Sequence, residues 1–170
     1  IATTGIDPTA PLIEAARQRD PGGDYRVAAA EAPGGIGTFD LVVCYLSLID
    51  IPDIETAIPA MAQALAPGGR LLIANLNGFN TAGLEKGWTT GETGFVIDDY
   101  LQPRAVWTEW RGIRIVNHHR PLSTYMALLL EAGLVLTHFA EPAAAGGDPM
   151  RVARYNRAPW CMLMEWQKPV

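Results

Sequence analysis

Residues 39–76 read FDLVVCYLSLIDIPDIETAIPAMAQALAPGGRLLIANL, and this stretch decides the fold. Residues 39–46 are continuously apolar after Asp40, residues 54–65 carry apolar side chains at helical spacing, and residues 70–76 form the next expected buried strand. Unbroken apolar runs are typical of strands that are buried on both faces. A helix between two such strands predicts a parallel pair joined by a crossover.

The alternation of strands and helices continues on both sides of this stretch. Before it, the pattern predicts a strand over 1–6, a helix over 11–19 and a strand over 25–29. After it, we expect an irregular segment over 77–100, an antiparallel hairpin over 105–117 that turns at Arg111-Gly112, a helix over 123–132, and two last strands over 134–139 and 160–166. The chain is therefore expected to be a single α/β domain.

Composition excludes several classes of function. The chain has 170 residues, 49% of them hydrophobic and 18% charged, which is typical of one globular domain. Its net charge of −5 argues against a nucleic-acid partner, since phosphate binding needs a basic surface. No apolar run is long enough to span a membrane, and no signal peptide is visible. The two cysteines lack metal spacing, so we expect reduced thiols in a cytoplasmic protein.

Three strand ends are candidate ligand contacts, because parallel sheets bind ligands beyond the carboxyl ends of their strands. Asp7 could accept both ribose hydroxyls of an adenosine, or could cap the following helix. Backbone amides of Ala30 and Glu31 could meet an adenine edge, or form an ordinary turn. Cys44, Tyr45 and Leu46 could line the floor of the cleft, or pack in the core, and these alternatives stay open.

No catalytic motif of another class stands out. The sequence lacks a nucleophile elbow, a Walker loop, an HExxH motif and an EF-hand loop. Asp98-Asp99 has no further ligands at metal spacing, so no metal site is predicted.

Three segments in this order resemble class I S-adenosylmethionine-dependent methyltransferases. They are GIDPTAPLIEAA at 5–16, FDLVVCYLSLIDIPD at 39–53 and ALAPGGRLLIA at 64–74. The segment HRPLSTYMALLLEAG at 119–133 is similar to a subgroup that methylates small molecules and carries an inserted cap. The resemblance implies a Rossmann-like three-layer sandwich with a mostly parallel sheet, an antiparallel C-terminal hairpin strand and a small cap over 77–117.

The resemblance also implies where S-adenosylmethionine binds. Asp7 stands where the family holds the cofactor ribose, and Pro8 and Leu12 stand where it flanks the adenine. The acid that often contacts the adenine amino group appears here as Ala29, so Ala30 and Glu31 are expected to take over that recognition.

Four aromatic residues and one histidine are the candidates for contact with the methyl acceptor. The expected acceptor contacts are Trp88, Tyr100, Trp107 and Trp110, although these side chains could equally form the core of the cap. His119 is the candidate general base, because an imidazole titrates near neutral pH; the alternative is that it orders the start of the last helix.

The expected function is methyl transfer from S-adenosylmethionine to a small-molecule acceptor. Two alternatives stay open: a non-catalytic cofactor-binding or interaction module of the same fold, and a nicotinamide-dependent dehydrogenase. The sequence leaves homo-oligomerisation open.

The family's first strand and its glycine-rich turn have no counterpart before Ile1. We therefore expect the domain to be N-terminally incomplete. The missing strand should lie between the strand that ends near Ile6 and the one that begins near Phe39, because a parallel sheet leaves no unpaired strand edges in its middle.

Overall fold

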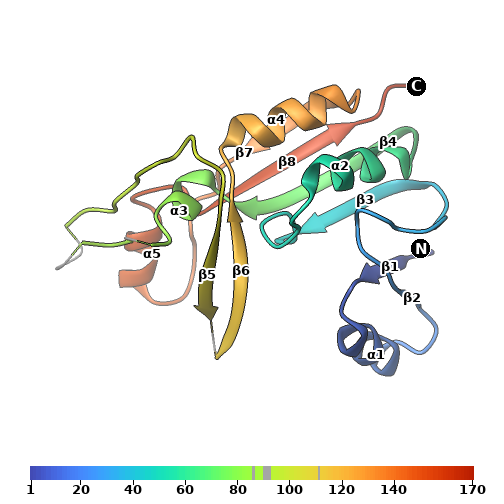
Figure 1. The fold of residues 1–170 in the computed structure, drawn as a ribbon, viewed down its shortest axis with the longest axis horizontal. Helices are drawn as coiled ribbons and strands as arrows, with labels where there is room; N and C mark the ends of the chain where they lie inside the picture. The colour runs from blue at the N-terminus through green and yellow to red at the C-terminus, as the bar shows by residue number, and fades with distance from the viewer. Residues whose placement is uncertain (86, 90–92, 111) are drawn as a thin grey trace.

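A computed structural model describes residues 1–85, 87–89, 93–110 and 112–170, without the side chain of Trp110. Its elements, in chain order, are β1 (Thr4–Asp7), α1 (Ala10–Arg19), β2 (Asp24–Val27), β3 (Phe39–Tyr45), α2 (Ile54–Gln63), β4 (Leu65–Leu76), α3 (Gly78–Ala82), β5 (Arg104–Trp110), β6 (Ile113–His119), α4 (Leu122–Glu131), β7 (Val135–Ala140), α5 (Pro149–Tyr155) and β8 (Cys161–Gln167) (Figure 1). None of the described helices is long and apolar enough to cross a membrane.

The main sheet has four strands in the order β3-β4-β8-β7. β3 and β4 are parallel, whereas β8 runs antiparallel to both of its neighbours. This confirms the predicted α/β fold with an antiparallel C-terminal strand.

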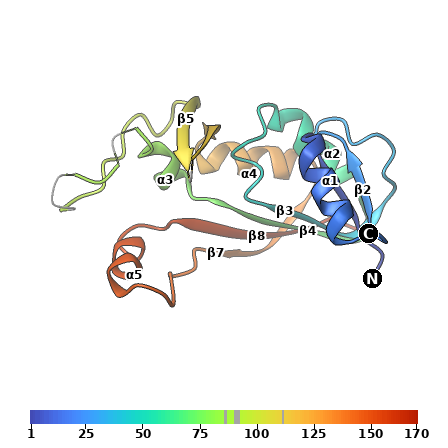
Figure 2. The same ribbon diagram turned by 90° about the horizontal axis from the view of Figure 1, so that it is seen from below.

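Only one face of this sheet is covered along its length. Helices α2 and α4 lie on that side, and α5 lies on the other (Figure 2). The core fills the space under α2 and α4, and its fully buried side chains include Leu48, Ile54, Leu71, Leu129 and Trp166. We call the other side the open face; on β3 it carries Leu41, Val43 and Tyr45, all at least half exposed.

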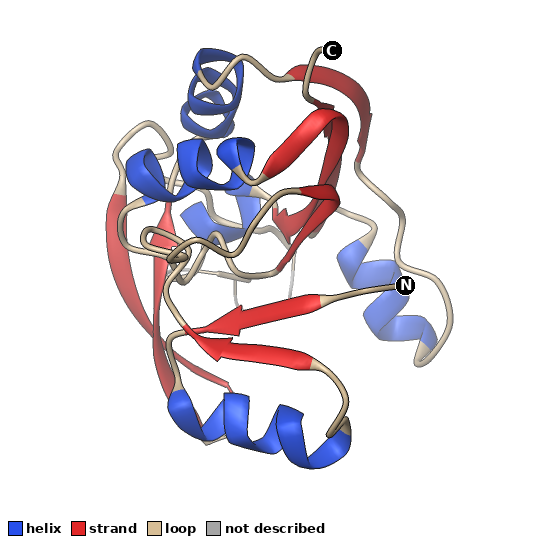
Figure 3. Ribbon diagram, turned by 90° about the vertical axis from the view of Figure 1, so that its right-hand side faces the viewer, coloured by secondary structure: helices blue, strands red, loops and turns tan. Residues whose placement is uncertain are grey.

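Strands β1 and β2 form a separate parallel pair, with α1 packed beside them (Figure 3). Ile13 anchors α1 and is 3% exposed. Among the described residues, neither strand is hydrogen-bonded to the four-stranded sheet. The expectation of a strand between β1 and β3 stays a prediction.

The cap region stands at the end of the sheet where β3 and β4 finish. Strands β5 and β6 form the expected antiparallel hairpin, from Arg104↔His119 to Trp110↔Ile113. Gly112 lies at the predicted turn, while Arg111 lies outside the described residues. Two short helices, α3 and α5, lie where the sequence predicted irregular chain. Their N-caps explain them: the side chain of Asn77 accepts from the Phe79 amide and that of Asp148 from the Met150 amide.

Strand β4 begins five residues earlier than predicted. Phe39 pairs with Leu65, and the ladder resumes only at Leu41↔Arg70, so the Pro67-Gly68-Gly69 turn is an irregularity inside the strand. Gly68 adopts a φ of +77°, which favours glycine.

Gly69→Ala is expected to destabilise the fold by roughly 1–3 kcal/mol, which is a fall in melting temperature of about 2–12 °C. A Cβ at Gly69 would lie 2.8 Å from the Ala66 carbonyl oxygen and 3.0 Å from that of Phe39, and backbone atoms cannot move aside cheaply. Calorimetric unfolding measures the change. Gly22→Ala is the matched control, because its Cβ would meet nothing closer than 3.9 Å. Equal melting temperatures for the two variants would refute the tight packing at Gly69.

Candidate functional site

The carboxyl ends of β1 and β2 bring the predicted adenosine contacts together. Asp7 pairs with Val27 in register, and the Ala28 amide donates to the Asp7 carbonyl oxygen at 3.2 Å. A turn over residues 29–32, closed by the Ala32 amide on the Ala29 carbonyl oxygen (3.1 Å), follows directly after Ala28. The backbone amides of this turn therefore share one strand edge with the Asp7 carboxylate.

The Asp7 carboxylate has one oxygen engaged and one open. Its Oδ1 accepts from the Thr9 amide at 2.7 Å, just before α1 begins. Within the described part of the chain, Oδ2 has no hydrogen-bond partner. Pro8 is exposed and the Leu12 side chain is 58% exposed, so an apolar surface flanks the acid. A carboxylate that accepts hydrogen bonds, backbone amides that donate them and apolar side chains together fit an adenosine.

The three residues predicted as ligand contacts at the end of β3 have different surroundings. Cys44 is 4% exposed and points into the core, where burial raises the pKa of its thiol. Its side chain therefore cannot contact a ligand in the cleft, because successive strand residues face opposite sides. Tyr45 is 71% exposed on the open face. Leu46 turns the chain with a φ of +53°, and its amide donates to the Ala74 carbonyl oxygen at 2.7 Å.

A non-glycine residue in the left-handed region is uncommon and costs roughly 1–3 kcal/mol, so the surrounding contacts must impose it. We name residues 46–53 the strand-exit loop.

Residues at the end of β6 fasten the strand-exit loop. The Arg120 guanidinium is 6% exposed and donates to the carbonyl oxygens of Leu48 (2.9 Å), Ile51 (2.8 Å) and Pro52 (2.8 Å). The cap and the strand-exit loop are thereby joined.

Two further contacts reinforce this junction. Asn117 Nδ2 donates to Asp50 Oδ1 at 2.8 Å, and the His118 amide donates to the Ile49 carbonyl oxygen at 2.6 Å. Burial raises the pKa of the Asp50 carboxyl, although the bond from Asn117 opposes that shift. Arg120, Asn117 and Asp50 were not predicted from the sequence as site residues.

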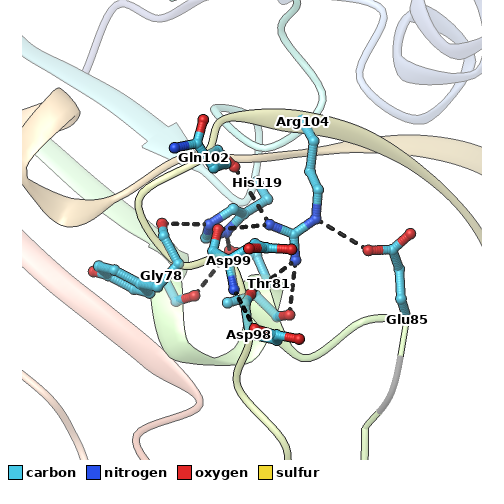
Figure 4. A network of polar contacts seen from close by, with 10 residues as sticks. Gly78, Thr81, Glu85, Asp98, Asp99, Gln102, Arg104 and His119 are labelled. Atoms are coloured by element: carbon cyan, nitrogen blue, oxygen red, sulfur yellow. Dashed lines mark hydrogen bonds and ion pairs between the residues drawn. The ribbon is translucent and has the colours of Figure 1, made fainter.

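His119 lies inside a polar network and not on an open surface (Figure 4). Its ring is fully buried, with Nδ1 at 2.7 Å from Thr81 Oγ1 and Nε2 at 2.9 Å from the Tyr100 carbonyl oxygen. Since a carbonyl oxygen only accepts, Nε2 carries the proton and Nδ1 accepts from the Thr81 hydroxyl. Both nitrogens are engaged, so this geometry favours a positioning role, and the predicted base role of His119 gains no support from it.

Arg104 completes the same network and holds the chain that precedes β5. Its guanidinium donates to the carbonyl oxygens of Ala82 (2.9 Å) and Asp99 (3.0 Å), and Nε lies 3.1 Å from Glu85 Oε2 (Figure 4). Arg104 and His119 are register partners at the base of the hairpin. The network therefore fixes the hairpin to α3.

We expect His119 to make stability fall as the pH falls. Burial lowers the pKa of His119 in the folded state, below its usual 6.5. As the pH falls, His119 therefore takes up a proton in the unfolded chain at a higher pH than in the folded chain. The contribution of His119 to the free energy of unfolding is full above about pH 7 and is lost as the pH falls through the lowered folded pKa. Urea unfolding at pH 8 and pH 5.5 measures it. His119→Gln, whose amide can donate and accept in similar places, should show a smaller difference between the two pH values. An unchanged difference would show that His119 does not contribute.

The aromatic residues predicted to contact the acceptor have different surroundings. The Tyr100 ring packs on Phe79 and His119, and its hydroxyl accepts from the Leu122 amide at 3.1 Å, which gives it a structural role. Trp107 is 62% exposed beneath the Arg114 guanidinium.

Trp88 stacks on Phe95, with the guanidinium groups of Arg154 and Arg157 over its ring. Trp88 and Phe95 are therefore joined to α5 and to Arg157 just beyond it. The Trp110 side chain lies outside the described residues. Trp88, Tyr100 and Trp107 have separate surroundings and do not form one wall.

Two asparagines at the end of β4 were also missed. Asn77 Nδ2 donates to Glu141 Oε1 at 2.5 Å, and the Asn77 amide donates to the Trp160 carbonyl oxygen at 3.0 Å. Asn75 is 1% exposed, and its side-chain amide has no hydrogen-bond partner among the residues that the structure describes. Asn75 and Asn77 lie two residues apart at the end of a predicted strand, and this position could have identified them from the sequence.

Comparison with known proteins agrees with this arrangement. Residues 1–73 match the family model described as a methyltransferase domain. A ubiquinone biosynthesis O-methyltransferase of Xanthomonas oryzae pv. oryzae is 38% identical over 80 residues, which are 44% of this chain and 34% of that protein. The match thus spans about a third of the length of this curated relative.

Solved structures share the fold over almost the whole chain. An S-adenosylmethionine-dependent methyltransferase from Mesorhizobium loti has a TM-score of 0.83 and 24% identity, covering 98% of this chain and 80% of that one. A protein from Listeria monocytogenes has a TM-score of 0.86 and 22% identity, covering 99% and 80%. The N-methyltransferase NodS from Bradyrhizobium japonicum, in complex with S-adenosyl-L-homocysteine, has a TM-score of 0.60 and 18% identity, covering 99% and 67%.

Proposed function

We propose that the chain is a class I S-adenosylmethionine-dependent methyltransferase and serves methyl transfer from S-adenosylmethionine to a small-molecule acceptor. The match of residues 1–73 to the methyltransferase-domain family and the fold shared with solved structures support this proposal. The observation that carries this proposal is the edge formed by β1 and β2. There the open oxygen of Asp7 lies beside the turn at residues 29–32, at the strand end where such sheets bind ligands.

The residues divide the work as follows. The Asp7 carboxylate would accept hydrogen bonds from the ribose hydroxyls, and the turn would contact the adenine edge through the amides of Ala30 and Glu31. Pro8 and Leu12 would flank the base with apolar surface. Tyr45 and the backbone of Leu46 would border the cofactor at the end of β3, while Arg120 keeps that loop in place.

When bound, S-adenosylmethionine supplies an electrophilic methyl group on a sulfonium. The acceptor's nucleophilic atom would form the new bond to the methyl carbon with its own electron pair, and the electrons of the broken carbon–sulfur bond would remain on the sulfur of S-adenosyl-L-homocysteine. The acceptor's proton leaves to solvent or to a base. Such a displacement asks the protein chiefly for proximity and alignment.

Calorimetric titration of the full-length protein with S-adenosyl-L-homocysteine tests the proposal. Saturable binding with one site per chain is expected. Absence of binding would favour the alternative, an interaction module of the same fold that does not use the cofactor. NADH is the control ligand, and we expect no binding, in keeping with the family match.

A further inference from the structure

A cavity of about 440 Å³ lies between the chain that follows β7, helix α5 and the first residue of β8. Drug-sized ligands typically occupy volumes of roughly 300–1,000 Å³. The walls include the small residues 143–147, Val152 and Cys161, together with the rings of Tyr155 and Trp160. The site therefore has room for a small molecule and none of the residues proposed to contact the cofactor lines it.

The cavity is built by specific contacts. The Asn156 side chain accepts from the Ala144 amide at 2.7 Å and donates to the Ala144 carbonyl oxygen at 3.2 Å. Asp148 caps α5 at the other end of the loop. The loop is thus fixed to both ends of the helix, and the space beneath it is held open.

The lining selects a flat apolar ligand. Tyr155 and Trp160 contact each other with ring centroids 5.6 Å apart, and each is 40% exposed. Alanine and glycine form the opposing wall, so no long side chain fills the space. Aromatic rings bind other flat rings well through stacking and apolar contact.

The charge of the lining selects an acidic group on that ligand. Arg151 is exposed at the wall, and in the part of the chain that the structure describes its guanidinium has no hydrogen-bond or ion-pair partner. Asp148, the acid in the same wall, uses one oxygen to cap α5. A guanidinium binds a carboxylate in a bidentate fashion, which makes an aromatic acid the matching class.

The position of the cavity relates it to methyl transfer. Tyr45, Ala74 and Leu163 form one row across β3, β4 and β8, and side chains in a row point to the same face, here the open face. With strands about 4.8 Å apart, Leu163 lies roughly 10 Å from the end of β3. Cys161, in the cavity wall, is two residues farther along β8, toward the same edge. The cavity wall at Cys161 therefore lies at the same end of the sheet as the end of β3, two strands away from it.

We propose that this cavity binds the methyl acceptor as an aromatic acid, with its ring against Tyr155 and Trp160 and its carboxylate on Arg151. The identification of the bound acid as the methyl acceptor rests on the proposed methyl transfer. Binding of the acid to the cavity does not depend on it and is tested separately.

The test uses the full-length protein and 2-naphthoate as the probe, with binding followed by calorimetry. We expect a dissociation constant of about 1 mM or below, and binding of neutral 2-naphthamide about tenfold weaker. Arg151→Gln should weaken naphthoate binding about tenfold and leave naphthamide binding unchanged. Val152→Phe should fill the cavity and abolish binding of both probes. The control Arg19→Gln removes an exposed charge from α1 and should change neither.

Each outcome bears on one proposal. Naphthoate that fails to bind, or that binds Arg151→Gln and Val152→Phe as tightly as the wild type, overturns the cavity assignment. Naphthoate binding with these losses, in a protein that does not bind S-adenosyl-L-homocysteine, supports the ligand class and overturns methyl transfer. S-adenosyl-L-homocysteine binding without naphthoate binding leaves methyl transfer intact and overturns the aromatic acid.

Discussion

Asp7→Ala is expected to weaken binding of S-adenosyl-L-homocysteine by roughly 10- to 100-fold, since charge-assisted hydrogen bonds are worth about 1.5–3 kcal/mol. The change removes the carboxylate oxygen that stands open at the end of β1. It also removes the bond to the Thr9 amide, 2.7 Å long in the folded chain. Calorimetric titration of the full-length protein measures the affinity, and urea unfolding measures the stability.

Asp7→Asn separates the two roles of this side chain. The amide oxygen can still accept from Thr9, so stability should return close to the wild-type value, whereas the affinity should recover only in part without the charge. Asp24→Ala is the matched control, because Asp24 is a carboxylate at the opposite, amino end of the same strand pair. An unchanged dissociation constant in Asp7→Ala would leave Asp7 with a helix-start role alone.

Arg120→Gln should lower the free energy of unfolding by roughly 3–5 kcal/mol, because it deprives the buried carbonyl oxygen of Leu48 and the partly buried ones of Ile51 and Pro52 of a charged donor. The strand-exit loop would lose its fastening to β6, so S-adenosyl-L-homocysteine affinity should fall as well. Urea unfolding and calorimetry measure the two effects.

Two substitutions sharpen this test. Arg120→Lys keeps the charge without the planar fork, so it should fall between Gln and the wild type and remain folded for the binding assay. Arg114→Gln removes an arginine from the exposed part of the same strand and should change unfolding by less than about 1 kcal/mol. A loss in Arg120→Gln as small as that control would mean that the three bonds do not hold the loop.

Much of the fold follows from local pattern. The largely apolar segments at 39–46 and 70–76 predicted adjacent parallel strands, and the structure pairs Val42 with Leu71 and Cys44 with Ile73. The start of β4 was wrong by five residues because the Pro67-Gly68-Gly69 turn reads as a strand boundary, whereas β4 bulges through it. The helix α5 was missed although Asp148-Pro149 is a helix-start signal, since the glycines before it suggested a loop.

The site was harder to predict because its contacts are non-local. Asp7 and residues 30–31 could be placed together, since both follow parallel strands. An unbroken apolar run does not say which residues face the core, so Cys44 and Tyr45 could not be told apart. The bonds from Arg120 to the strand-exit loop join residues about 70 positions apart, and no spacing in the sequence reveals them.

The bonds between the end of β6 and the strand-exit loop have a consequence for how two ligands would communicate. The acceptor cavity borders α5, whose Arg154 lies over the Trp88 ring of the cap, and the cofactor would border the end of β3. Arg120 joins the end of β6, at the base of the cap hairpin, to the loop that follows β3. If occupancy of one site shifts this junction, thermodynamic linkage requires each ligand to change the other's affinity by the same factor. Titrating each ligand in the absence and presence of the other gives two ratios of dissociation constants, which should be equal. In Arg120→Lys both ratios should move toward one.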